Sequence, residues 1–317
     1  MSPRDILIQN ALLRTVAFFD AIDVAPTWGE CLTNVEWRMP SAMNASECAP
    51  PSGEELVIAR TQLVDQKRIE MGMGRLALAG RLARHLTTAF ERMPIQSRKL
   101  LRAHRVAQII AHLDAVRFVA LANTTSLGFA RDGGDLDLFV VTASGNLWLT
   151  RGLAVTPYRM LGKLATSDAA PDAVCFSYFV TDARLDLSPH TLAPDDPYFR
   201  YWFLSLLPLY DDGVGEQLWQ ANQSLLATHP RASAWMVPPA LTIPRPRLRI
   251  PRMPAFESLA RAAQMRWFPT QIKTRMNTDT TVIVSDDTLK FHTDDGRLAF
   301  RAAYQDRLHS LGIDLNS

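Results

Sequence analysis

The sequence has little cysteine, no large excess of charge of either sign and no long apolar run. Its 317 residues include only three cysteines, Cys31, Cys48 and Cys175, and they lack the CxxC or Cys/His spacing of a structural zinc site. We therefore expect neither a disulfide framework nor a zinc finger. The 34 Lys and Arg nearly balance the 32 Asp and Glu, so the net charge of +2 excludes an overall field that draws the chain to nucleic acid or to an anionic membrane.

The apolar stretches are too short to cross a membrane. Val116–Ala122 and Phe203–Leu209 are examples, and both fall far below the ~20 residues of a spanning helix. The first residues, MSPRDILIQN, include an acid and lack the apolar core and cleavage site of a signal peptide. We therefore expect a cytoplasmic protein with no membrane partner. Hydrophobic residues make up 47% and charged residues 21%, which is typical of a globular protein of about two domains.

The first eighty residues predict a module of three helices and a hairpin. Ser2 is a typical N-cap with proline after it, and it begins an amphipathic helix that ends near Asp20. Two capping boxes, Thr27–Glu30 and Ser52–Glu55, begin two shorter helices. A hairpin follows within Arg68–Ala79, where a Gly-Met-Gly sequence supplies the turn.

Three helices followed by a hairpin are the outline of a winged helix, which we assign to residues 1–80. A helix that reads DNA normally carries Lys and Arg toward the phosphates. Here the corresponding helix, at about Glu54–Gln66, opens with two acids. We therefore expect this module to pack against protein and not to bind DNA, and a DNA-binding regulator is kept only as an alternative.

Residues 81–112 predict connecting helices interrupted at Pro94. Cations follow on adjacent turns, at Arg98, Lys99, Arg102 and Arg105. Such a stripe is typical of a solvated helix face, and contact with phosphate or RNA is the alternative.

Beyond this stripe the pattern changes to alternating strands and helices. Val116–Ala122, Leu136–Thr142 and Ala173–Thr181 have the length and apolar character of buried strands, and Leu147–Leu161 predicts a helix before the third. This order is an α/β unit. We expect Asp195–Ala227 to return to helix.

The last part of the chain predicts a linker and a helical segment. Residues 238–254 are proline-rich and basic, with arginines at 245, 247, 249 and 252. We expect this linker to lie on the domain surface, with tracking of a polyanion as the alternative. Residues 255–317 predict a C-terminal helical segment with helices at Phe256–Arg266 and Arg297–Leu311.

The stretch that carries chemistry is LANTTSLGFARDGGDLDLFVVT, from Leu121 to Thr142. Asp135 and Asp137 are one residue apart at the start of a strand, so both carboxylates face the same side. Two like charges that close repel each other, and a shared cation such as Mg²⁺ is the usual reason to tolerate them. Upstream, the turn Asn123–Gly128 leads into a short helix whose amides can hold a phosphate. The alternative is a surface hairpin in which Asp132–Asp135 only makes a turn.

This pattern resembles the signature of the DNA polymerase beta-like nucleotidyltransferase superfamily, Gly-Ser followed after about ten residues by Asp-h-Asp-h on a strand, where h is apolar. The resemblance implies an α+β fold. Its polymerase-beta-type nucleotidyltransferase core, a small mixed sheet with helices, would occupy residues 113–237. The winged-helix-like module would flank it on one side and the C-terminal helical region on the other.

More narrowly, the chain is similar to a group of bacterial and archaeal nucleotidyltransferase-domain proteins of poorly defined substrate. Three short motifs of that group are matched in order along the chain. They are Tyr-Phe-Asp with Pro-Leu-Thr, matched by Phe18-Phe19-Asp20 and Pro26-Thr27; Leu-Trp-x-x-Arg, matched by Leu147, Trp148 and Arg151; and Phe-His-x-x-Asp, matched by Phe291, His292 and Asp295.

Two positions depart from the family pattern. Asn123-Thr124 replaces Gly-Ser, and this pair keeps a hydroxyl at Thr124 and a residue that tolerates positive φ at Asn123. The family's third carboxylate lies on the following strand, where Val174–Thr181 offers Ser177 and no acid. Asp182, just beyond that strand, is the remaining candidate.

The resemblance implies a Mg²⁺-dependent nucleotidyltransferase that moves a nucleoside monophosphate from a nucleoside triphosphate (NTP) to a hydroxyl or phosphate acceptor and releases pyrophosphate. The acceptor would be a small molecule, RNA or protein. Asp135 and Asp137 would hold two Mg²⁺ ions, Asp182 would be the third catalytic acid, and Asn123, Thr124, Gly128 and Arg151 would contact the NTP. The alternative is a catalytically weak or inactive nucleotide-binding or regulatory protein on the same scaffold. Two residues also have a structural interpretation, a buried salt bridge for Arg151 and a loop-anchoring hydrogen bond to Asp295 for His292.

Overall fold

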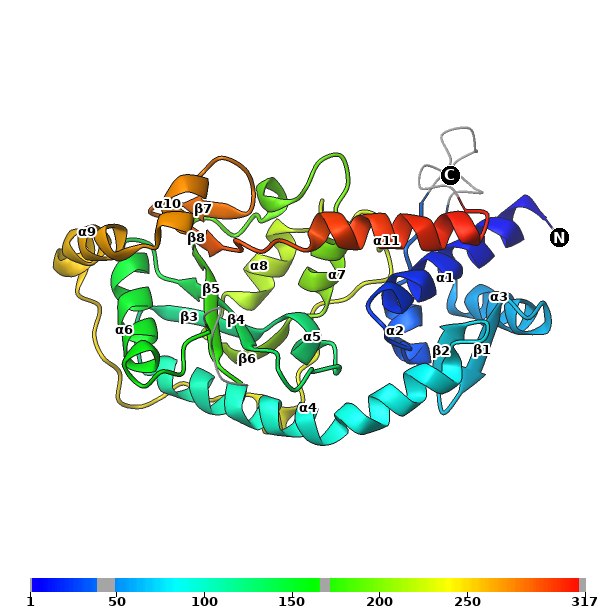
Figure 1. Cartoon of the computed structure of the whole chain (residues 1–317), viewed down its shortest axis with the longest axis horizontal. Coiled ribbons are helices and arrows are strands. Elements are labelled where there is room, and N and C mark those ends of the chain that lie inside the picture. Colours follow the sequence, from blue (N-terminus) through cyan, green and yellow to red (C-terminus); the bar gives the residue numbers. More distant parts are fainter. Residues whose placement is uncertain (1, 39–48, 166–171, 314–317) are drawn as a thin grey trace.

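A computed structural model describes residues 2–38, 49–165 and 172–313. The protein is a mixed α+β chain in which a small N-terminal module stands beside a six-stranded sheet. Two long helices, α4 (Leu82–Ile110) and α11 (Arg297–Ser310), run between these two parts along opposite edges of the molecule (Figure 1).

The N-terminal module has the three helices and the hairpin that the sequence predicts. They are α1 (Pro3–Ala21), α2 (Trp28–Thr33), α3 (Gly53–Asp65), β1 (Ile69–Gly72) and β2 (Arg75–Leu78). A capping box begins each helix, so both predicted boxes are confirmed. The two turn residues, Met73 and Gly74, both have positive φ, which matches the twist of a two-residue hairpin.

Helix α1 is not amphipathic, and that prediction is wrong. Every residue from Ala11 to Asp20 is buried, because α3 and β2 cover part of the helix and α11 covers another part. Phe18 stacks on Tyr201 with ring centroids 3.6 Å apart, and Tyr304 of α11 approaches the Phe18 ring edge-on. The C-terminal helix therefore completes the core of the N-terminal module.

Helix α4 is a single helix that contains Pro94, so the expected interruption is also wrong. The helix bends near its middle instead of ending (Figure 1). A proline removes one backbone donor and displaces one turn, and a long helix absorbs this change by bending.

The six-stranded sheet has the order β6-β3-β4-β5-β8-β7. Its strands are β3 (Val116–Leu121), β4 (Leu136–Thr142), β5 (Val174–Thr181), β6 (Leu207–Asp211), β7 (Val282–Val284) and β8 (Thr288–Phe291). Only β4 and β5 pair in parallel, and the other pairs are antiparallel. Helix α6 (Leu147–Met160) makes the crossover between the two parallel strands.

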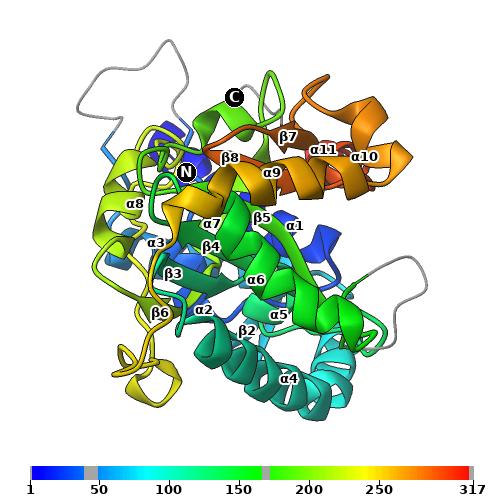
Figure 2. The ribbon, with the colours of Figure 1, turned by 90° about the vertical axis from the view of Figure 1, so that its left-hand side faces the viewer.

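Helices cover both faces of the sheet. On one face α4 and α6 pack on alternate side chains of β4, Leu136, Leu138 and Val140. Helix α9 (Glu257–Trp267) lies beside α6 (Figure 2). On the other face α7 (Pro197–Leu204) and α8 (Gly215–Ala221) pack on Phe139 and Val141. The period of two in β4 thus assigns each residue to one helical layer.

Four elements in the second half differ from the prediction. Residues 195–227 are not one helical stretch, because β6 lies between α7 and α8. The C-terminal segment is not helical throughout, because α10 (Thr270–Arg275), β7 and β8 precede α11. Strand β6 contains Pro208 and pairs only with β3 at the sheet edge, where proline is tolerated.

The proline-rich segment 238–254 lies on the domain surface, as expected. Its backbone pairs with the domain, since Ile250 N donates to His112 O over 2.7 Å and Ile243 N donates to Leu209 O over 2.8 Å. Arg249 and Arg252 form ion pairs with Asp114 at 2.9 and 3.1 Å. Across the described ranges, no helix has both the length and the apolar character that crossing a membrane requires.

Candidate functional site

The two carboxylates of the Asp-x-Asp motif lie at the start of β4. Asp135 directly precedes the strand, and Asp137 is its second residue. Leu136 and Leu138 enter the core beneath α6, so Asp135 and Asp137 alternate to the opposite face, the one that carries Phe139. Among the residues that the structure describes, no lysine, arginine or histidine forms an ion pair with either carboxylate.

The turn between β3 and β4 closes around Asp137. Ala122 N donates a hydrogen bond to Asp137 O over 2.9 Å, and the side chain of Asn123 hydrogen-bonds to the Asp137 carboxylate. Asn123 has φ of +58°, the left-handed conformation that its predicted tolerance allows. The Tyr198 hydroxyl on α7 approaches Asn123 Oδ1 at 3.4 Å. Asn123 therefore orients one of the two carboxylates.

Thr124 and Gly128 lie in the same turn. Residues 123–126 form the short helix α5 (Asn123–Ser126), and Phe129 N donates to Thr124 O over 2.9 Å. Gly128 has φ of +78°, and its amide donates to Thr125 O over 3.3 Å. The Gly128 amide is thus engaged within the turn, whereas the predicted phosphate contact through the Thr124 hydroxyl stays a prediction.

Cys175 is a site residue that the sequence did not indicate. In the parallel pair of β4 and β5 it lies directly opposite Asp137, and its thiol donates a hydrogen bond to that carboxylate. Ligand atoms of Asp135, Asp137 and Cys175 all lie within 4.8 Å of one another. Only the register of two neighbouring strands that are distant in sequence creates this group, so no local motif could have revealed it.

The electrostatics of the group raise the pKa of Asp137 and of the Cys175 thiol, which favours their neutral forms. Burial raises the pKa of Asp137 to about 6, and the nearby charge of Asp135 acts in the same direction. Burial also raises the pKa of the Cys175 thiol well above its usual value, and both carboxylates add to this effect. Lys99 acts on Asp137 in the opposite direction, but among the described residues no cation forms an ion pair with either carboxylate.

A second layer of polar residues continues from Cys175 along β5. The side chain of Ser177 hydrogen-bonds to Cys175, and Ser177 Oγ lies 3.0 Å from His292 Nε2. Burial lowers the pKa of His292 to about 3, so the ring is neutral at pH 7. The expected partner of His292, Asp295, instead pairs with Arg297 at 2.6 Å. His292 thus belongs to the surroundings of Cys175 and does not anchor its own loop through Asp295.

Asp182 does not lie beside Asp135 and Asp137, so the structure does not bring the predicted third acid together with the motif. In the parallel register Leu136 pairs with Val174 and Thr142 pairs with Thr181. Asp182 therefore follows the far end of β5, about 20 Å from the start of β4 at ~3.3 Å per residue. Its carboxylate accepts hydrogen bonds from Ser144 N at 2.9 Å and Ser144 Oγ at 2.8 Å.

Arg151 lies on the opposite face of the sheet from the carboxylates. It belongs to α6, where Nη1 donates to Gln264 Oε1 over 2.6 Å and the guanidinium lies 4.6 Å from the centre of the Phe291 ring. Burial lowers the pKa of Arg151 to about 10. Of the two interpretations, the geometry favours the structural one, with an amide and an aromatic ring in place of the expected carboxylate.

The cationic stripe of α4 supports the loop that precedes Asp135. The side chain of Lys99 is fully buried, forms an ion pair with Asp172 at 2.8 Å and donates to Gly134 O. Arg98 pairs with Asp172 at 2.8 Å and with Asp132 at 2.7 Å. Lys99 is thus buried against the loop, whereas Arg98 stays on the solvated face predicted for the stripe and is held there by its two ion pairs.

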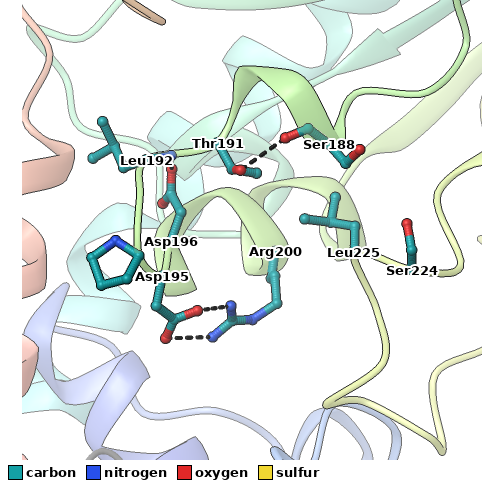
Figure 3. A pocket seen from close by; sticks show the side chains of 9 residues that line it. Ser188, Thr191, Leu192, Asp195, Asp196, Arg200, Ser224 and Leu225 are labelled. Atoms are coloured by element: carbon teal, nitrogen blue, oxygen red, sulfur yellow. Dashed lines mark hydrogen bonds and ion pairs between the residues drawn. The ribbon is translucent and has the colours of Figure 1, made fainter.

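A pocket of about 310 Å³ lies beside the N-terminus of α7 (Figure 3). Its charged lining residues Asp195 and Arg200 pair with each other, and Asp195 also pairs with Arg38 at 2.7 Å. Asp196 caps α7 by accepting from Phe199 N over 2.9 Å. The charges that face this pocket are therefore satisfied within the protein, and neither motif carboxylate lines it.

Comparisons with protein-family models, curated proteins and solved structures found no match for this chain.

Proposed function

We propose that the protein is a metal-dependent nucleotidyltransferase that moves a nucleoside monophosphate from an NTP to a hydroxyl or phosphate acceptor and releases pyrophosphate. One observation carries the proposal. Asp135 and Asp137 share one side of β4 beside the turn 123–128, and no cation of the described residues forms an ion pair with them. This arrangement agrees with the order of strand, turn and Asp-x-Asp strand in the sequence.

In this proposal Asp135 and Asp137 hold a divalent cation through their carboxylate oxygens, with Mg²⁺ as the ion that the sequence pattern implies. The bound cation would neutralise phosphate charge and stabilise the attacking and leaving oxygens. Asn123 orients Asp137 through its side-chain hydrogen bond. The Thr124 hydroxyl, one residue further along the turn, would contact the phosphates of the NTP.

Loss or weakness of catalysis is the second candidate, and one observation favours it. The described ligand group contains Cys175 beside the two aspartates, and Asp182 lies at the other end of the sheet. Within the described residues this group therefore contains a thiol and no third carboxylate that could activate an acceptor hydroxyl. A protein that binds a nucleotide and regulates a partner would retain Asp135 and Asp137 for the same electrostatic reason.

The test is transfer of label from NTPs labelled in the α-phosphate to a panel of hydroxyl and phosphate acceptors, in the presence of divalent cation. The full chain is compared with an Asp135→Asn/Asp137→Asn variant. Asp132→Asn and Asp182→Asn are the matched controls, since each removes an acid outside the ligand group. We expect the double variant to lose transfer by at least ~100-fold and both controls to retain it.

Three outcomes decide against this scheme. Transfer that survives in the double variant refutes the site. Absence of transfer in the unaltered chain, together with calorimetric binding of Mg²⁺ and NTP that needs Asp135 and Asp137, establishes the non-catalytic function instead. Loss of transfer in Asp182→Asn with an unchanged fold would refute the placement of the site at the start of β4.

A further inference from the structure

We infer that Cys175 is the third ligand of the Asp135–Asp137 cation site, and that the site therefore selects a transition-metal dication of the Zn²⁺ or Co²⁺ class over Mg²⁺. The inference rests on the cation site of the proposed function, and it names the metal class that this site takes. It does not depend on nucleotidyl transfer.

The first support is geometric. Cys175 pairs with Asp137 across the parallel strands β4 and β5, and one ligand atom from each of the three residues lies within 4.8 Å of the other two. Ligands at ~2.0–2.3 Å from one ion lie up to ~4.5 Å apart, so small side-chain rotations bring all three onto a single ion. The three ligands come from two adjacent strand ends, which are rigid supports for such a site.

The second support is the charge of the group. Two carboxylates converge where the described chain provides no ion-pair partner within 4.0 Å, whereas the nearby Asp172 has three cations within that distance. Lys99 is directed to Asp172 and to Gly134 O instead of to the motif. Asp172 is thus paired directly with cations of the chain, whereas Asp135 and Asp137 form no ion pair and Asp137 receives only the longer-range charge of Lys99, so an external cation can pair with both.

The third support is the surroundings of the thiol. Ser177 hydrogen-bonds to Cys175 and lies 3.0 Å from His292 Nε2, so the sulfur is held by a second layer of polar groups. Residues that orient a ligand in this way are typical of built metal sites. The register shift of β5 opposite β4, between the pairs of Asp137 and Phe139, lies next to Cys175 and Ser177. Bulges of this kind redirect side chains toward functional sites.

The donor set determines the metal class. Mg²⁺ takes oxygen ligands almost exclusively, whereas thiolate sulfur favours Zn²⁺, Co²⁺ and related ions. On binding, the S–H bond of Cys175 breaks, the proton leaves to solvent, and a sulfur lone pair forms the bond to the cation. No oxidant or reductant takes part. A site with two carboxylates and one thiolate therefore binds Co²⁺ more tightly than a site with oxygen ligands alone.

Co²⁺ titration of the metal-free full chain, without nucleotide, tests the inference. Thiolate coordination produces a sulfur-to-cobalt charge-transfer absorption in the near ultraviolet, and calorimetry gives the affinities for Co²⁺ and Mg²⁺. We expect the band in the unaltered chain and its loss in Cys175→Ser and Cys175→Ala, with Co²⁺ affinity reduced about 10–100-fold and Mg²⁺ affinity nearly unchanged. Cys175→Asp should lose the band and gain Mg²⁺ affinity.

Controls separate this site from the other thiols. Cys31 is buried in the N-terminal module, and Cys48 lies outside the described residues, so Cys31→Ala and Cys48→Ser should both keep the band. A band that survives in Cys175→Ser, or Co²⁺ binding without any band, overturns the inference and leaves the transferase proposal intact. Cobalt binding that is unchanged in Asp135→Asn/Asp137→Asn overturns both. If the Co²⁺ band depends on Cys175 but nucleotidyl transfer is unchanged in Asp135→Asn/Asp137→Asn, only the transferase proposal is refuted.

Discussion

Replacing Asp137 with asparagine should stabilise the metal-free protein at high pH. Burial and the charge of Asp135 raise the pKa of Asp137 from 3.8 to about 6 in the folded state. The folded protein therefore favours the neutral carboxyl, and the associated stability is complete below pH ~4, is lost progressively between pH ~4 and ~6, and is absent above pH ~6. Asparagine has nearly the same shape and never ionises, so its contribution does not depend on pH.

The size of the effect follows from the pKa difference. A shift of about 2 units at ~1.36 kcal/mol per unit is an upper limit of about 3 kcal/mol, and partial exposure of Asp137 reduces it to about 1–3 kcal/mol. Unfolding entropy of ~2.1 cal/mol/K per residue gives about 0.7 kcal/mol/K for the whole chain. Asp137→Asn should thus raise Tm by about 1.5–4 °C at pH 8 and leave it nearly unchanged at pH ~3.5, below the unfolded pKa.

Thermal unfolding in a metal chelator, followed by circular dichroism at both pH values, measures this difference. Asp132→Asn is the control, because that side chain is exposed in the same loop and its pairing with Arg98 is at the surface. Saturating cation should reverse the order at pH 8, since only the unaltered site gains stability from binding. A variant that is no more stable than the parent at pH 8, or equally more stable at both pH values, refutes the reasoning.

Three further substitutions test the support of the site. Asn123→Ala should lower the free energy of unfolding by about 1 kcal/mol relative to Asn123→Gly, because φ of +58° strains alanine; equal thermal stability would show that the turn relaxes. Lys99→Met should lower the free energy of unfolding by about 2–3 kcal/mol, because it leaves the largely buried Asp172 with its more exposed partners. The exposed control Arg105→Met should change the free energy of unfolding by less than ~0.5 kcal/mol, and denaturant unfolding measures both. Arg151→Met should lower Tm but leave cation and NTP affinity unchanged in calorimetry, and the opposite pattern would restore its predicted phosphate role.

Local sequence signals predicted local structure well, because their physics acts within a few residues. Ser2, Thr27 and Ser52 begin helices where their side chains can accept from free amides, and strand β4 has the predicted bounds Leu136–Thr142. The predictions failed where contacts between segments distant in the sequence determine the structure. Helix α1 is buried on all sides because α11 covers it, and β6 is a strand because β3 supplies its partner.

The candidate site divides in the same way. The spacing of Asp135 and Asp137 by itself determined that both carboxylates share one side of a strand, because side chains alternate along any β-strand. The residue that completes the group was decided by tertiary structure alone. Parallel pairing of β4 with β5 brings Cys175 to Asp137 and carries Asp182 to the far end of the sheet. Strand register depends on packing between segments far apart in sequence, and no spacing within either segment encodes it.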